Sequence, residues 1–374
     1  MNSTVTIEQL NSEEVERLVP LLVYLGLIAV TGIPGNIIVC LVYRDISKRS
    51  VSRFFIWWLA VIDIISCFVL FLEIVNVVRQ YTYTNAWLCK FTIFFTIWPV
   101  ITSGFGLCLI SIDRFRRVCR PLQKQISHKM AHLMCLATVI IAFLFSWPSL
   151  ILFGTYKSDI SDYNLTSSTC TFQNEYQGTT YTLVYSGLLW LLFLLTLVFL
   201  SAVYILIGKA ICTQMGKRVS SEIKTDQNSK AHTTPSDDNT NNTTETSFAA
   251  SKSNQTLYRE QNNIVRKMST ISFRTKLRVS SQRQAKARKS AFIMFIISFV
   301  FVVSFLPYLL LRINEAFDKT FVHSMSDIGR ACYKSFLRTY FLNCAVNPII
   351  YCACAATFRR KVREVLRQLC SKLR

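Results

Sequence analysis

The sequence predicts an all-α membrane protein, a bundle of seven transmembrane helices followed by a short amphipathic eighth helix. Of the 374 residues, 51% are hydrophobic and 17% are charged, and the mean hydropathy is +0.34, which is too apolar for an ordinary soluble chain. Roughly seven segments of about 20 or more residues are apolar enough to cross a bilayer. The last one ends in Asn347-Pro348-Ile349-Ile350-Tyr351, whose polar groups require neighbouring helices as partners.

These segments divide the chain into three parts. Residues 1–17 form an expected extracellular N-terminus, residues 18–352 the transmembrane domain and residues 353–374 an amphipathic helix and cytoplasmic tail. The expected spans are residues 18–43, 54–79, 87–119, 129–154, 179–212, 287–314 and 326–352. No cleavable signal peptide is visible, because the acidic start of the chain lacks basic residues. We therefore expect the first span to act as its own insertion signal.

The distribution of charge predicts the orientation. On a soluble protein the formal net charge of +21 would suggest nucleic acid, but here basic residues flank apolar segments, so we expect contact with anionic lipids and no nucleic-acid partner. Lysine and arginine concentrate in the first, third and fifth loops, which places the N-terminus outside and the C-terminus inside the plasma membrane. The sequons at Asn2 and Asn164 then lie outside and are expected to be glycosylated, whereas those at Asn242 and Asn254 lie inside.

Two further segments are expected on the cytoplasmic side. Residues 213–285 are rich in Ser, Thr and Asn and cannot bury enough apolar surface to fold, so we expect a mostly disordered third cytoplasmic loop. Residues 357–369 combine helically spaced apolar residues with a basic opposite face, which predicts a helix on the membrane surface. Cys370 at its end is a candidate for acylation, with an unmodified thiol as the open alternative.

Three of the 13 cysteines lie at or near the outer face, namely Cys89, Cys170 and Cys332. Cys89 opens the third span and Cys170 lies in the middle of the following outer loop. A disulfide between them would hold that loop over the mouth of the bundle. We expect Cys332 to remain a free packing residue.

Short motifs lie in order along the spans. They are Gly35-Asn36, Leu59-Ala60, Asp63, Trp87, Cys89, Asp113-Arg114-Phe115, Tyr204, Phe301, Phe305-Leu306-Pro307 and the motif that ends at Tyr351. Each is weak alone, but their order and placement are highly specific together. From about residue 20 to residue 370 the chain resembles a rhodopsin-like (class A) G-protein-coupled receptor of the peptide-receptor type.

The resemblance implies an allosteric sodium ion and no other cofactor. The residues that match the family's sodium site are Asp63, Ser103, Asn343 and Asn347. A carboxylate at mid-membrane needs partners or a cation, because burying it bare is prohibitively costly. A structural hydrogen-bond network around a protonated Asp63 is the alternative.

The resemblance also implies a switch and its partners. The switch residues are Asp113, Arg114, Phe115, Tyr204, Phe301, Phe305, Pro307, Asn347, Pro348 and Tyr351. Arg114 is expected to pair with Asp113 at rest and to meet a heterotrimeric G protein and Tyr204 in the active state. Pro307 is expected to kink the sixth helix, because it lacks an N–H donor and crowds the preceding turn. Further expected partners are a receptor kinase, arrestin and membrane lipids.

Four positions depart from the family pattern. Phe305 replaces the usual tryptophan of the sixth helix, Thr196 replaces the usual proline of the fifth, and the tryptophan of the fourth lies further out, at Trp147. Ala287-Arg288-Lys289 offers no carboxylate to Arg114 at the base of the sixth helix. We therefore expect the resting state to be held less tightly.

The outer half of the bundle indicates the ligand class. Thr96 stands where amine receptors carry an aspartate, so a monoamine ligand would lack its buried counter-ion. The middle of the seventh span has Leu337 and Phe341 and is expected to have no lysine nearby, which excludes a retinal Schiff base. The expected ligand-binding residues are Glu73, Phe95, Thr96, Val100, Tyr308, Arg312, Tyr333 and Leu337, with Trp98 and Phe336 beside them. One acid and one base within an aromatic ring suit a peptide, most naturally a neuropeptide, with charged or amidated ends. The alternative is that Glu73 and Arg312 simply pair with polar groups at the water boundary.

Other classes of protein fit less well. A transporter would show internal repeats or broken helices in matching halves, and an enzyme would show a histidine or serine–histidine constellation. The four histidines are scattered at His128, His132, His232 and His323, so no enzyme is expected. A lipid- or small-molecule-sensing receptor of the same fold is the stronger alternative. The resemblance to peptide receptors also implies that residues 169–172 form one strand of a hairpin lid.

Overall fold

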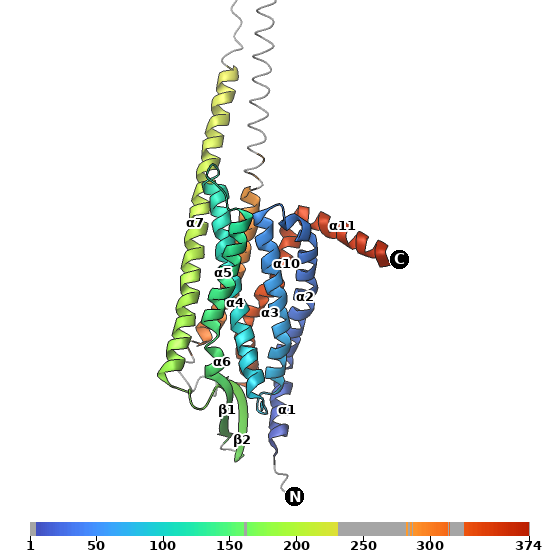
Figure 1. Cartoon of the computed structure of the whole chain (residues 1–374), viewed down its shortest axis with the longest axis vertical. Helices are drawn as coiled ribbons and strands as arrows, with labels where there is room; N and C mark the ends of the chain where they lie inside the picture. Colours follow the sequence, from blue (N-terminus) through green and yellow to red (C-terminus); the bar gives the residue numbers. More distant parts are fainter. Residues whose placement is uncertain are drawn as a thin grey trace, which may run out of the picture.

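The computed structural model describes residues 5–160, 163–230, 287–312 and 325–373, together with residues 282, 285 and 314; side chains are described except at positions 46, 217–230, 369, 372 and 373. Long helices lie side by side in a bundle (Figure 1). A β-hairpin and the N-terminal helix α1 lie at one end, called the hairpin end below, and the C-terminal helix α11 leaves from the other, called the α11 end.

Six helices among the described residues are long and apolar enough to span a membrane. They belong to α2 (Val19–Ser47), α3 (Val51–Val78), α4 (Ala86–Cys119), α5 with α6 (His128–Ser146 and Ser149–Leu152), α7 (Thr180–Lys230) and the Ala287–Arg312 helix. Each agrees with an expected span to within a few residues, except at the end of α7. Residues 213–230, expected to begin a disordered loop, continue α7 as helix. Residues 231–281 of that predicted loop lie outside the described part.

The seventh expected span is interrupted. It consists of α9 (Asp327–Phe336), a 3₁₀ turn (Thr339–Phe341) and α10 (Leu342–Cys354). At the interruption the Thr339 hydroxyl donates to the carbonyls of Ser304, at 2.7 Å, and Phe336, at 2.9 Å. Thr339 thus ties the seventh span to the Ala287–Arg312 helix close to Pro307, where that helix lacks one of its own backbone donors.

The predicted amphipathic helix is α11 (Ala356–Leu373), which meets the end of the seventh span at 102°. Phe358 is 1% exposed and its ring lies 5.8 Å from that of Tyr43. Arg359 donates to the last carbonyls of α10, those of Cys352 and Ala353, each at 2.8 Å. A buried aromatic anchor and a cap on the preceding helix therefore fix the bend, and α11 points away from the bundle (Figure 1).

The predicted lid strand belongs to a hairpin of β1 (Phe153–Ile160) and β2 (Leu165–Phe172), with Phe153 opposite Phe172 and Ile160 opposite Leu165. Asn164 in its turn has φ +52°, a conformation that asparagine tolerates better than most residues. Ser168 of β2 also exchanges backbone hydrogen bonds with Tyr81 and Tyr83, at 2.8 and 2.9 Å. The hairpin is therefore paired to the α3–α4 connection as well as to itself.

Close packing between helices depends on three glycines. A Cβ atom added to Gly32 would lie 2.6 Å from the Cys67 sulfur, and one added to Gly35 would lie 2.9 Å from the Pro348 side chain. A Cβ on Gly106 would lie 2.6 Å from the Trp58 ring. These contacts bring α2 close to α3 and α10, and α4 close to α3.

Candidate functional site

The buried polar centre of the bundle contains Asp63, which is 1% exposed on α3. Asn347 of α10 donates to its Oδ2 atom at 2.7 Å. Three more oxygens are buried without a hydrogen-bond partner among the described residues, namely Asp63 Oδ1, Ser103 Oγ and Asn343 Oδ1. Three orphaned oxygens from three elements, one of them on a carboxylate, form a donor set suited to a small hard cation. The four residues therefore fit the implied sodium ion.

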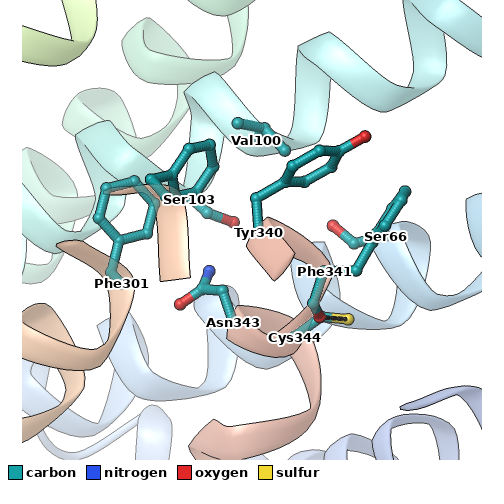
Figure 2. A pocket seen from close by; sticks show the side chains of 9 residues that line it. Ser66, Val100, Ser103, Phe301, Tyr340, Phe341, Asn343 and Cys344 are labelled. Atoms are coloured by element: carbon teal, nitrogen blue, oxygen red, sulfur yellow. Dashed lines mark hydrogen bonds between the residues drawn. The ribbon is translucent and has the colours of Figure 1, made fainter. Parts of the chain in front are cut away.

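A small cavity of about 10 Å³ adjoins this centre, and such a volume holds about one water-sized particle. Ser103 and Asn343 approach it from α4 and α10, and Val100 and Phe301 also line it (Figure 2). Phe305 also lines the cavity. The centre of its ring lies 4.7 Å from that of Phe301 and 5.6 Å from that of Tyr340. Phe305 thus lies within an aromatic stack that joins the sixth and seventh spans.

Asp113 lies at the α11 end and is 1% exposed. Ser52 Oγ donates to it at 2.5 Å, and Arg117 Nε lies 3.0 Å from each carboxylate oxygen. The guanidinium of Arg114 is further away, at 3.9 Å. The expected Asp113–Arg114 pair is thus present as a longer contact, whereas Ser52 and Arg117 are the principal partners and were not predicted. The i,i+4 spacing of Asp113 and Arg117 could have revealed one of them.

Arg114 of α4 is 4% exposed. The Ser298 hydroxyl donates to that of Tyr204 at 3.1 Å and so joins the Ala287–Arg312 helix to α7. The Tyr351 hydroxyl is buried without a hydrogen-bond partner among the described residues. Arg120 lies over the Phe115 ring, 5.7 Å from its centre.

Glu73 lies near the hairpin end of α3 and is 5% exposed. Its Oε1 atom accepts a 2.7 Å hydrogen bond from Arg338 Nε, and Asn76 donates to Oε2 at 3.4 Å. Arg338 was not in the predicted ligand-binding set, and its ion pair with Glu73 is of the kind that the alternative of pairing with a neighbouring polar group describes. The exposed Arg312 lies over the Tyr308 ring at 5.7 Å, a favourable cation–π distance.

Another carboxylate is buried at the hairpin end, on α1 (Figure 1). Glu14 of α1 (Ile7–Arg17) is 2% exposed and accepts a 2.7 Å hydrogen bond from Lys334. Arg17 and Arg330 lie 3.7 and 3.9 Å from its other oxygen. Sequence reasoning missed this group and also overlooked Lys334 of α9, in the part of the seventh span nearest the hairpin end. Burial, with a smaller contribution from Glu14, raises the pKa of the neighbouring Tyr81 phenol.

Helix α1 has further anchors at the hairpin end. The Asn11 amide donates to the Val78 carbonyl and accepts from the Tyr81 backbone N–H, each at 2.9 Å. Thr6 and Gln9 form a capping box at its start. The helix thus lies against the mouth of the bundle.

The predicted ligand-binding residues lie in different environments. Trp98 donates through its indole N–H to the Val139 carbonyl of α5, at 3.2 Å, so its side chain contacts that helix. Thr96 donates to the Thr92 carbonyl within its own helix. The remaining members are the buried Tyr333, the partly buried Leu337, the partly buried Phe95 and the exposed Phe336.

The structure confirms the expected disulfide between Cys89 and Cys170. Cys332 is a free, exposed thiol, as is Cys370 at the end of α11. Asn164 is exposed in the hairpin turn, whereas Asn2 lies outside the described residues.

A family model described as 7 transmembrane receptor (rhodopsin family) matches residues 35–351. The chain is 31% identical over 163 residues to the C3a anaphylatoxin chemotactic receptor of Danio rerio, covering 42% of this chain and 43% of that protein. It is 31% identical over 124 residues to the cholecystokinin receptor type A of Homo sapiens, covering 32% and 28%. It is 29% identical over 213 residues to the neuromedin-U receptor 1 of Mus musculus, covering 54% and 48%. The chain thus spans less than half the length of each of these relatives.

Proposed function

The chain belongs to the rhodopsin family of seven-transmembrane receptors, and from this membership we propose that it binds an extracellular peptide and activates a heterotrimeric G protein. The observation that carries the proposal is the family match over residues 35–351, together with a charged mouth at the hairpin end and a buried Arg114 at the α11 end. The matched family is one of signalling receptors rather than enzymes.

The hairpin end is the extracellular end in this proposal. The excess of lysine and arginine in the first, third and fifth loops supports a cytoplasmic α11 end of a plasma-membrane protein. Asn164 is exposed in the hairpin turn and is the favoured glycan site among the described residues. The basic face of α11 suits anionic lipids of the inner leaflet, where Cys370 would be accessible to acylation.

A peptide ligand is favoured over a lipid for two reasons. The relatives found are named as receptors for C3a, cholecystokinin and neuromedin U. The hairpin end also presents several cationic side chains, including the exposed Arg312 beside Tyr308. Cations and aromatic rings at a water-exposed mouth match the acidic and apolar groups of a peptide better than an uncharged lipid.

Activation would expose Arg114, at the α11 end, to a G protein. Outward movement of the Ala287–Arg312 helix would separate Ser298 from Tyr204, which now hydrogen-bond at 3.1 Å. Arg114 has only a 3.9 Å contact with Asp113, so little needs to be broken before it can face a G protein. A receptor kinase and arrestin would use the same end.

A peptide screen tests the ligand class. Synthetic peptide libraries are applied to cells that express the chain, with calcium and cyclic AMP measured together. Arg312→Gln should lower the potency of an active peptide about 30-fold or more, because a desolvated charge contact typically contributes about 2–5 kcal/mol. Arg79→Gln, an exposed arginine at the same end of the bundle, is the matched control. Equal potency in both variants, or activation by lipid extracts alone, would favour the lipid alternative.

Sodium binding is tested without a ligand. Purified receptor should be more stable in sodium chloride than in choline chloride of equal ionic strength, by about 1.4 kcal/mol at roughly ten times the dissociation constant. Asp63→Asn should remove the difference, whereas Ser66→Ala should retain it, because the Ser66 hydroxyl already donates to the Ile62 carbonyl. The measurement is the thermal unfolding midpoint. A sodium effect that survives in Asp63→Asn would support the structural network around a protonated Asp63.

A further inference from the structure

Three basic residues lie on the seventh span at the hairpin end. Arg330 and Lys334 lie one turn apart on α9, and Arg338 follows two residues after that helix ends. Lys334 and Arg338 each hydrogen-bond a carboxylate at 2.7 Å, from Glu14 and Glu73 respectively. The row of cations is thus matched by carboxylates from two different elements.

The two carboxylates differ in how firmly the chain holds them. Glu73 lies within the membrane-spanning helix α3, so it cannot leave without disrupting that span. Glu14 lies on α1, an 11-residue helix at the start of the chain that is joined to α2 through Leu18. An isolated helix of this length is marginal in water. The position of α1 therefore depends on what it contacts.

The contacts of α1 converge on its carboxylate. Glu14 is 2% exposed, whereas the Arg17–Asp327 pair, at 3.5 Å, has side chains that are 42% and 58% exposed. Exposed pairs contribute little, but a nearly buried one contributes more. Apart from the two Asn11 hydrogen bonds, Glu14 is thus the main polar anchor.

The cationic side of this contact belongs to the bundle itself. The side chains of Lys334 and Arg330 are 17% and 27% exposed and lie 2.7 and 3.9 Å from Glu14 oxygens. When α1 moves away, both lose that carboxylate and remain as two cations one turn apart on α9. Such a position favours replacement of the lost carboxylate by another one.

We propose that Lys334 and Arg330 form a carboxylate-binding site at the mouth of the receptor, that Glu14 occupies it as a tethered competitor, and that an acidic peptide ligand displaces Glu14 with a carboxylate of its own. The last part rests on the proposed peptide-receptor function. A short tether gives Glu14 a millimolar effective concentration, so a free ligand needs further contacts to compete. A ligand without a carboxylate would leave α1 in place.

The site itself is tested by chemical rescue in the full-length chain, purified in lipid nanodiscs. Glu14→Ala removes a fragment the size of acetate. Hydrogen exchange of the α1 amides should rise about tenfold or more, and acetate at about 50 mM, above the effective concentration of a short tether, should reverse the rise. Acetamide and chloride at the same concentration should not. Glu13→Ala, which removes an exposed glutamate of the same helix, should leave exchange unchanged.

One further variant guards against misfolding. Glu14→Ala combined with Lys334→Gln should lose the response to acetate. Equal exchange in the Glu14→Ala and Glu13→Ala proteins, or equal effects of acetate and acetamide, would overturn the site.

The role in ligand binding is tested with the peptide library, each peptide prepared with a free carboxyl group or as its amide. Glu14→Ala should increase the potency of the acid forms, and this gain should be about tenfold or more greater than that of the amide forms. Glu13→Ala should change the potency of neither form. Equal gains for acids and amides would overturn displacement by a carboxylate. If no peptide signals through any variant, the proposed function fails, and the acetate experiment still decides the site.

Discussion

Arg338→Gln is expected to lower the stability of the protein by about 3–5 kcal/mol, because it leaves Glu73 as a buried charge without its principal partner. The two side chains are only 15% and 7% exposed and lie 2.7 Å apart. Water can therefore replace the lost guanidinium only in part. The thermal unfolding midpoint of the purified protein and the surface level in cells would both report the loss.

A double variant and an exposed pair supply the controls. Glu73→Gln combined with Arg338→Gln removes both charges, so it should recover most of the lost stability. Arg360→Gln breaks an exposed i,i+4 pair with Glu364, at 3.9 Å, and should cost less than about 0.5 kcal/mol. A double variant as unstable as Arg338→Gln alone would show that the ion pair is not the cause.

Cys170→Ser is expected to cost about 2–5 kcal/mol, because the bond to Cys89 closes a loop with a sequence separation of 81 residues. The hairpin would keep its backbone hydrogen bonds to Tyr81 and Tyr83 but lose its covalent attachment to α4. The measurement is again the unfolding midpoint, supported by mass mapping of non-reduced peptides.

Cys332→Ser is the matched control for the disulfide, because Cys332 is an exposed free thiol at the same end of the bundle. A surface change of this kind should stay within about 0.5 kcal/mol. Equal losses for Cys170→Ser and Cys332→Ser, or a mapped bond that joins Cys89 to Cys332, would contradict the assignment.

The spans and the amphipathic helix could be predicted because each follows from a local pattern, whereas the hairpin strand was expected from the family resemblance. Apolar runs of membrane length mark the first six spans, and the helical spacing of Phe358 and Val362 marks α11. The interruption of the seventh span was not predicted. At the interruption the Thr339 hydroxyl donates to a carbonyl of another helix. A local sequence pattern does not indicate a hydrogen-bond partner that is distant along the chain.

The charged pairs of the site were the least predictable feature. Sequence reasoning found Glu73 but not Arg338, which is 265 residues away, and it treated the N-terminal glutamates only as evidence against a signal peptide. The spacing of Arg330, Lys334 and Arg338 was visible and could have indicated one charged face. Which carboxylate each cation meets depends on how the helices pack, and one sequence does not carry that information.

The three close-packed glycines also determine how the chain tolerates inherited variation. Every amino acid that a single-nucleotide change can substitute for glycine carries a Cβ atom, so Gly32, Gly35 and Gly106 have no conservative replacement. At each of them the added atom would meet a neighbour at 2.9 Å or less, and overpacking of this kind typically costs about 1–3 kcal/mol. Gly26, Gly187 and Gly208 have nothing within 4 Å of the added atom. Glycines of one membrane domain thus divide into intolerant and permissive positions, and the division follows helix contact rather than depth in the bilayer.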